Sequence, residues 1–223
     1  DFKFIEKIER DLAPATPPLK IMTFAFKTVK VNDNWEIAGI SGITYNKVDP
    51  EKNVEVNSGE LERGMFAIVR KLPNTNFPKD FDARSKSYKD IRIKAEETEA
   101  ALINSFIGQI GAFDPDVLTV HDAYTSVLDT ILNRIKKLKI GNWSKLSRLK
   151  KISPIDGTGL FRARHATSGR LICDTFLSSR EFIRETNYSL THLARNFLGQ
   201  ARNDFDENAI HHFYRNSDYL LQM

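Results

Sequence analysis

Apolar and polar residues alternate along three stretches in the first third of the chain, and such alternation predicts β-strands with two differently exposed faces. The stretches cover residues 21–29, 35–46 and 65–72. A turn signal at residues 31–34, Val-Asn-Asp-Asn, separates the first two. We therefore expect a three-stranded meander, followed by a loop over residues 73–87 and a short fourth strand at 89–94.

The spacing of the apolar residues changes at Glu96, from where they recur every three or four positions up to Ile110. This spacing predicts an amphipathic helix. Further along the chain the pattern predicts two more strands and three more helices: a strand at 117–121, a helix at 124–135 that ends before Gly141, a strand at 169–178, and helices at 189–198 and 208–222. The sequence thus indicates an α/β fold, with a mixed β-sheet flanked by α-helices.

One position in the first strand does not fit an ordinary buried sheet. Side chains alternate between the faces of a strand, so Lys27 shares a face with Thr23, Ala25 and Val29, while Met22, Phe24, Phe26 and Thr28 occupy the other. A lysine there is explained if the strand lies at the edge of the sheet, where solvated charges are common. It is equally explained if Lys27 serves a site on that face.

The composition is that of an ordinary globular protein, with 41% hydrophobic and 28% charged residues and a net charge of +4. No run of 18 apolar residues is present, so we expect no membrane partner.

The single cysteine, Cys173, lies in an apolar run that favours an inert buried thiol. Without a cysteine pair, the five histidines lack zinc-ligand spacing, and a surface position is expected for His211 and His212.

Positive charge is concentrated in one segment. Between Arg134 and Arg170 there are eleven Lys or Arg residues and a single acid, Asp156, whereas acids outnumber bases in the rest of the chain. Such a distribution is typical of a surface that faces a polyanion. The alternative is a solvated charged face without a partner.

Five segments carry a family resemblance, and they occur in family order over residues 17–198. They read PPLKIMTFAFKTV (17–29), FDPDVLTVHD (113–122), ILNRIKKLKIGNWSKLSRLKK (131–151), SGRLICD (168–174) and SREFIRETNYSLTHLARNFL (179–198). Together they resemble the exonuclease-type domain of B-family DNA polymerases, most closely that of the alpha group of eukaryotic replicative polymerases. The resemblance implies a ribonuclease H-like 3′–5′ exonuclease fold over residues 20–223. It further implies that residues 1–19 connect to a preceding N-terminal domain, and that the last motif of the family lies beyond Met223.

The same resemblance places the metal-binding carboxylates of proofreading relatives on residues that are not acidic. The family's first Asp and Glu fall on Ala25 and Lys27, and the third carboxylate falls on Val127, or on Ser126 if the register shifts by one. Two-metal cleavage of a phosphodiester needs several carboxylates to hold the divalent ions. We therefore expect a non-catalytic domain that holds no cofactor. Two alternatives are an active metal-dependent exonuclease with unconventional ligands and a protein-interaction module without affinity for DNA.

Nearby acids offer no obvious replacement. Asp122 follows the strand at 117–121 and is the one acid that could approach the site. Asp129 is expected on the polar face of its helix, beside Asn133 and pointing away. Asp174, within the SGRLICD motif, is expected to accept structural hydrogen bonds.

The basic segment supplies candidate contacts to a nucleic-acid backbone, or to the polymerase core or a partner subunit. The candidates are Lys145, Arg148, Lys150, Lys151, Arg162, Arg164 and Arg170. Trp143 lies among them and serves either to stack on a base or to anchor the loop on the core.

The resemblance also implies a setting for the whole protein. The parent would be a nuclear DNA-directed DNA polymerase that extends RNA primers, with Mg²⁺ bound in a polymerase site outside this chain. Its partners would be template DNA, an RNA–DNA primer, the other domains of the polymerase, primase and an accessory subunit.

Overall fold

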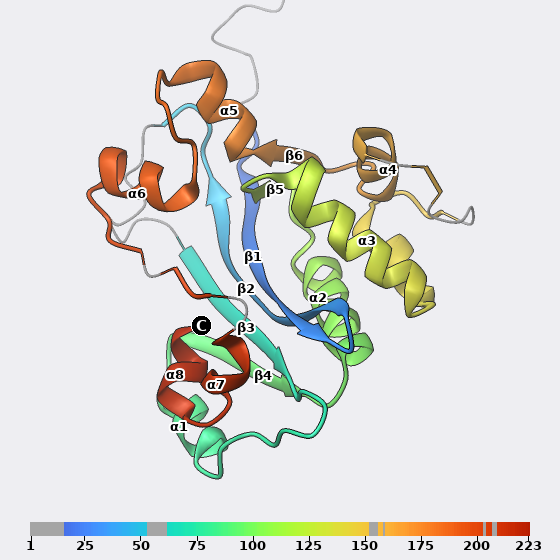
Figure 1. Cartoon of the computed structure of the whole chain (residues 1–223). Coiled ribbons are helices and arrows are strands. Elements are labelled where there is room, and N and C mark those ends of the chain that lie inside the picture. Colours follow the sequence, from blue (N-terminus) through green and yellow to red (C-terminus); the bar gives the residue numbers. More distant parts are fainter. Residues whose placement is uncertain (1–15, 53–61, 152–155, 158, 203, 207–208) are drawn as a thin grey trace, which may run out of the picture.

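A single six-stranded sheet organises the chain (Figure 1). The computed structural model describes residues 16–52, 62–151, 156–157, 159–202, 204–206 and 209–223, so most of the expected connector at 1–19 lies outside the described residues. The strands follow the order β4-β3-β2-β1-β5-β6. Their bounds are Leu19–Val31 (β1), Asn34–Val48 (β2), Glu62–Arg70 (β3), Ile91–Glu96 (β4), Val117–Val120 (β5) and Leu171–Asp174 (β6).

The sheet is mixed, as the sequence predicted. The strands β1, β2 and β3 form an antiparallel meander, whereas β4 runs parallel to β3, β5 parallel to β1, and β6 parallel to β5. The strand β1 as a whole is not an edge strand, because it lies between β2 and β5 in the sheet. The edge interpretation of Lys27 therefore holds only locally. Pairing with β5 involves only residues 21–23, so the part of β1 that carries Lys27 is hydrogen-bonded to β2 alone.

Helices flank the sheet on both sides. In Figure 1, α2 and α3 cover one face, while α1, α7 and α8 lie together near β3 and β4. No helix in the described ranges has the length and apolar character that a membrane crossing requires. The helical elements are α1 (Phe81–Ser87), α2 (Glu99–Phe113), the π-helical turn η2 (Ala123–Val127), α3 (Leu128–Lys137), the 3-10 turn η3 (Gly141–Leu146), α4 (Gly159–Ala166), α5 (Thr175–Phe182), α6 (Leu190–Leu198), α7 (Ile210–Phe213) and α8 (Ser217–Gln222).

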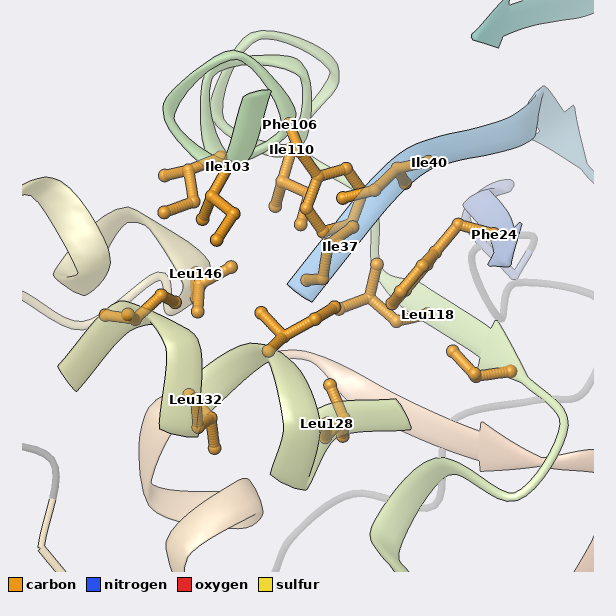
Figure 2. Close-up of a cluster of buried hydrophobic side chains, with 14 of the residues drawn as sticks. Phe24, Ile37, Ile40, Ile103, Phe106, Ile110, Leu118, Leu128, Leu132 and Leu146 are labelled. Atoms are coloured by element: carbon orange, nitrogen blue, oxygen red, sulfur yellow. The ribbon is translucent and has the colours of Figure 1, made fainter. Parts of the chain in front are cut away.

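The main core forms where the sheet meets α2 and α3. Figure 2 shows Phe24 and Leu118 of the sheet facing Phe106 of α2 and Leu128 of α3. The centres of the Phe24 and Phe106 rings lie 4.8 Å apart. A second cluster on the other side contains Val29 together with residues of α1, α7 and α8. The alternation predicted for β1 is therefore confirmed, because Met22 and Phe24 on one face pack in the main core and Val29 on the other face packs in the second cluster.

A buried group of charges, which the apolar pattern did not predict, joins the sheet to α2 and α3. The Glu99 carboxylate accepts hydrogen bonds from the Ile37 backbone N–H at 2.8 Å and from the Arg134 guanidinium through Nε, at 2.7 Å, and Nη2. Glu36 lies 3.4 Å from Arg134 and 2.8 Å from Arg70. Each buried charge thereby has an opposite partner, which burial requires.

Several sequence-based element predictions are wrong in detail. The helix predicted over 124–135 begins as the π-helical turn η2 and is α-helical only from Leu128. The strand predicted over 169–178 ends at Asp174, because that side chain caps α5 and turns the chain into a helix. The loop predicted over 73–87 contains α1. The predicted helix over 208–222 is divided into α7 and α8 by a turn at 214–216.

Candidate functional site

A cavity of about 900 Å³ opens on the sheet face that points away from α2. Small side chains leave this space, since Ala25, Ser41 and Ala67 are neighbours across β1, β2 and β3. They alternate along their strands with large residues such as Phe24 and Phe66, which point into the core. The cavity therefore opens where three neighbouring strands carry small side chains on the same face.

The structure brings the three candidate positions together at this cavity. Ala25 and Lys27 reach it from β1, and Val127 reaches it from η2, as does the adjacent Ser126. Val127 also packs against the main core. The Lys27 ammonium lies 5.8 Å from the centre of the Phe205 ring, a cation–π arrangement on the cavity wall.

The wall of the cavity is apolar and carries positive charge. Lys27 and Arg202 are its charged residues, and no Asp or Glu occurs among the described residues that line it. Throughout the described part of the chain, no group of three or more His, Cys, Asp or Glu side chains is arranged to hold a metal ion. The chemistry of this wall therefore favours anions over divalent cations.

His121 lies at the end of β5, where the cavity meets α5. Its Nδ1 is 3.0 Å from the Thr175 hydroxyl oxygen, and its ring meets Phe176 edge-on. Burial lowers the pKa of His121 below its usual 6.5, so the imidazole is neutral at pH 7. His121 thus contributes a polar group, but no charge, to the cavity at that pH.

Asp174 is the structural acceptor that the sequence predicted. Its buried carboxylate accepts hydrogen bonds from the backbone N–H groups of Asp122 at 3.1 Å, Ala123 at 2.9 Å and Phe176 at 3.0 Å. It also accepts a longer one, at 3.4 Å, from Leu177. The side chain therefore fixes both the start of η2 and the start of α5.

Replacing Asp174 with alanine is expected to lower the free energy of unfolding by about 2–4 kcal/mol, because a helix cap and two acceptors for buried N–H groups are lost together. Urea denaturation followed by circular dichroism measures the change. Asp156→Ala is the matched control, since that carboxylate makes one exposed ion pair with Lys136, worth about 0–1 kcal/mol. Equal effects of the two variants would contradict the structural role of Asp174.

The other nearby acids do not line the cavity. Asp122 has a left-handed backbone, with φ of 56°, and its carboxylate accepts a hydrogen bond from the Thr125 hydroxyl. Asp129 accepts hydrogen bonds from Asn133, at 2.8 Å, and from Arg162, at 3.3 Å. Both carboxylates therefore have partners within the chain, away from Lys27.

Three of the seven basic candidates make ion pairs with described residues of the chain. The side chain of Arg170 is buried and donates hydrogen bonds to Asp114, Pro115 and Leu146. Arg148 makes ion pairs with Asp114, at 2.9 Å, and Asp116, at 2.8 Å, and the hydrogen bond from its guanidinium is the main cause of the lowered pKa of Asp114. The side chain of Arg162 is buried against Asp129 and Asn133.

The other four candidates remain closer to solvent. Lys145, Lys150 and Arg164 are exposed, and Lys151 is half-buried, with its ammonium donating to the Ser168 hydroxyl at 2.9 Å.

Trp143 packs half-buried against the main core, which favours anchoring over stacking on a base. The exposed positions predicted for His211 and His212 are confirmed, whereas Cys173 is only half-buried.

Comparisons with known proteins found one family model and several similar sequences. The family model described as DNA polymerase family B, exonuclease domain, matches residues 3–193. The DNA polymerase alpha catalytic subunits of Oxytricha trifallax and Sterkiella nova are each 35% identical over 218 residues, which is 93% of this chain and 14% of theirs. The Xenopus laevis subunit is 31% identical over 226 residues, covering 97% of this chain and 15% of its own. The chain thus spans about a seventh of the length of these relatives.

Proposed function

The chain belongs to the exonuclease-domain family of the family B DNA polymerases, and we propose that it is a non-catalytic member of that family with a structural role. The family match confirms the resemblance found in the sequence motifs, and the mixed sheet with its flanking helices is consistent with the expected ribonuclease H-like fold. The parent, by similarity to DNA polymerase alpha catalytic subunits, is a DNA-directed DNA polymerase.

The observation that carries the proposal is the charge of the cavity. Metal-dependent phosphodiester cleavage uses carboxylates to hold two divalent ions against the scissile phosphate. The described wall offers Ala25, Lys27 and Val127 at the candidate positions, and no carboxylate. At roughly 4 Å and an effective dielectric constant of about 20, a lysine would repel a divalent ion by about 8 kcal/mol before screening.

Lys27 contributes to the structure of the site instead. Its ammonium supplies a positive charge where a nuclease would hold metal, and it packs over Phe205. An ammonium can neutralise an anion, but it cannot lower the pKa of a water molecule as a bound metal does. In this proposal the domain braces the rest of the polymerase and presents its basic segment to single-stranded template.

The proposal places the chain in DNA replication. The parent would extend RNA primers with deoxynucleotides in the nucleus, in complex with primase and an accessory subunit. Template DNA and the RNA–DNA primer would be its nucleic-acid partners, and its Mg²⁺ ions would bind in a polymerase site outside this chain. The similarity to alpha catalytic subunits over 93–97% of the chain supports this assignment.

A nuclease assay tests the proposal. Purified chain is incubated in excess with a 5′-labelled single-stranded oligonucleotide and Mg²⁺ or Mn²⁺, and the products are separated by denaturing electrophoresis. We expect the oligonucleotide to keep its full length, as in a parallel reaction with EDTA. Metal-dependent shortening by the pure protein would overturn the proposal and favour an exonuclease with unconventional ligands.

A further inference from the structure

The surface around α4 combines exposed apolar side chains with cations. Phe161 is 83% exposed, and Leu149 and Leu160 are also exposed. The six residues Leu149, Lys150, Lys151, Leu160, Phe161 and Arg164 are called the α4 surface below. In Figure 1, α4 lies well apart from α7 and α8. Residues of α8 line the cavity beside Lys27, whereas no described residue of α4 does, so the α4 surface is separate from that cavity.

Hydrogen bonds and helix geometry hold these residues close to one another. Phe161 and Arg164 are three positions apart on α4, so their side chains lie on the same side of the helix. The Lys151 ammonium donates to the Ser168 hydroxyl, which donates to the Arg164 carbonyl oxygen at 3.0 Å. Lys150 precedes this anchored lysine in the sequence, so the α4 surface combines one exposed aromatic ring with three cationic residues.

The positive charge of the α4 surface is not cancelled by the acids around it. Asp156 pairs with Lys136, and Asp129 with Arg162. Lys150 and Arg164 make no ion pair with any described residue. An anion that approaches the surface therefore meets cations that are available for contact.

From this arrangement we propose that the α4 surface binds single-stranded nucleic acid, with a base stacked on Phe161 and the backbone phosphates near Lys150 and Arg164. Single strands expose the faces of their bases, and aromatic side chains flanked by cations are a recurrent means of binding them without sequence preference. A duplex buries those faces and would gain only the phosphate contacts. The inference rests on the proposed template-facing role and deepens it by naming the residues and the mode of contact.

Replacing Phe161 with alanine tests the stacking. Fluorescence anisotropy with a labelled thymidine oligonucleotide at low salt is expected to show about tenfold weaker binding, as the loss of one stacked base predicts. Folding is not at risk, because the side chain is almost fully exposed. Phe182→Ala, at an 80% exposed position on α5, is the matched control and should bind like the unmodified chain. Affinity for a duplex of the same length should not depend on Phe161.

The charge reversals Lys150→Glu and Arg164→Glu test the phosphate contacts. Together they should weaken binding and reduce the slope of log K against log salt concentration by about 1.4, because each phosphate contact with a single strand contributes about 0.7. Lys86→Glu on α1, another exposed lysine, is the control.

The outcomes separate this inference from the proposed function. If the reversals weaken binding but Phe161→Ala does not, stacking is wrong and the template-facing role stands. If the unmodified chain binds but neither set of substitutions changes binding, the α4 surface is not the site, and the inference fails while the DNA-binding role stands on other residues. If the unmodified chain does not bind at low salt, both the inference and the DNA-binding role fail, which would favour a protein-interaction module. Equal affinity for a polyglutamate peptide would contradict a nucleic-acid site. The nuclease assay is independent of these results.

Discussion

Replacing Glu99 with alanine is expected to lower the free energy of unfolding by about 3–5 kcal/mol, the usual effect of removing one partner from a buried ion pair. The substitution leaves the Arg134 guanidinium and the Ile37 N–H without the acceptor that both use. Arg134 would retain only its 3.4 Å contact with Glu36. Urea denaturation, monitored by circular dichroism and by tryptophan fluorescence, measures the loss.

Glu97→Ala provides the matched control for this experiment. Glu97 is two residues away, is mostly exposed, and makes a 3.5 Å surface ion pair with Lys71. Such pairs contribute about 0–1 kcal/mol, so the control should be nearly as stable as the unmodified chain. If Glu99→Ala were no more destabilising than Glu97→Ala, the buried charges would not hold β2 to α2 and α3 as described.

A second large effect is expected when the missing carboxylates are supplied. The double substitution Ala25→Asp and Lys27→Glu should create Mn²⁺ affinity that the unmodified chain lacks, measurable by isothermal titration calorimetry. Changing Lys27 to glutamate turns a repulsion of about 8 kcal/mol into an attraction of similar size before screening. Even a tenth of that difference, about 1.6 kcal/mol, changes the affinity more than tenfold.

Two further variants separate the effect of removing the positive charge from the effect of adding carboxylate ligands. Lys27→Met removes the positive charge without adding a ligand and should leave Mn²⁺ affinity undetectable. Adding Val127→Asp to the double variant should tighten binding further, because Val127 lines the same cavity. If Mn²⁺ affinity did not rise in either the double or the triple variant, these positions would not face a common site.

Local sequence patterns determine much of the fold. The alternation in residues 21–29 identified both faces of β1, and the helical spacing after Glu96 identified α2, whose actual start at Glu99 follows the Thr98 cap. The pattern failed at residues 175–178, where the apolar run continues but the chain becomes helical. Asp174 decides that change through N–H groups from two segments about fifty residues apart in the sequence, which no local pattern contains.

The candidate site, like the fold, was predictable from the sequence only in part. Motif resemblance selected Ala25, Lys27 and Val127, and their position around one cavity follows from the adjacency of β1 and β5 in the sheet. Sequence alone could not separate Arg170 from Arg164, since both lie in one basic segment. Arg170 is buried by contacts with Asp114 and Pro115, more than fifty residues earlier, whereas Arg164 faces solvent.

Anomalous scattering from crystals of the unmodified chain soaked in Mn²⁺ shows whether the cavity holds a divalent metal ion. The cation at position 27 and the carboxylate-free described wall predict no ordered manganese in the cavity beside Lys27. The Ala25→Asp, Lys27→Glu variant, soaked in the same way, should show a peak there. An ordered manganese ion held by protein oxygens beside Lys27 in the unmodified chain would show a metal site there and overturn the assignment of a non-catalytic domain.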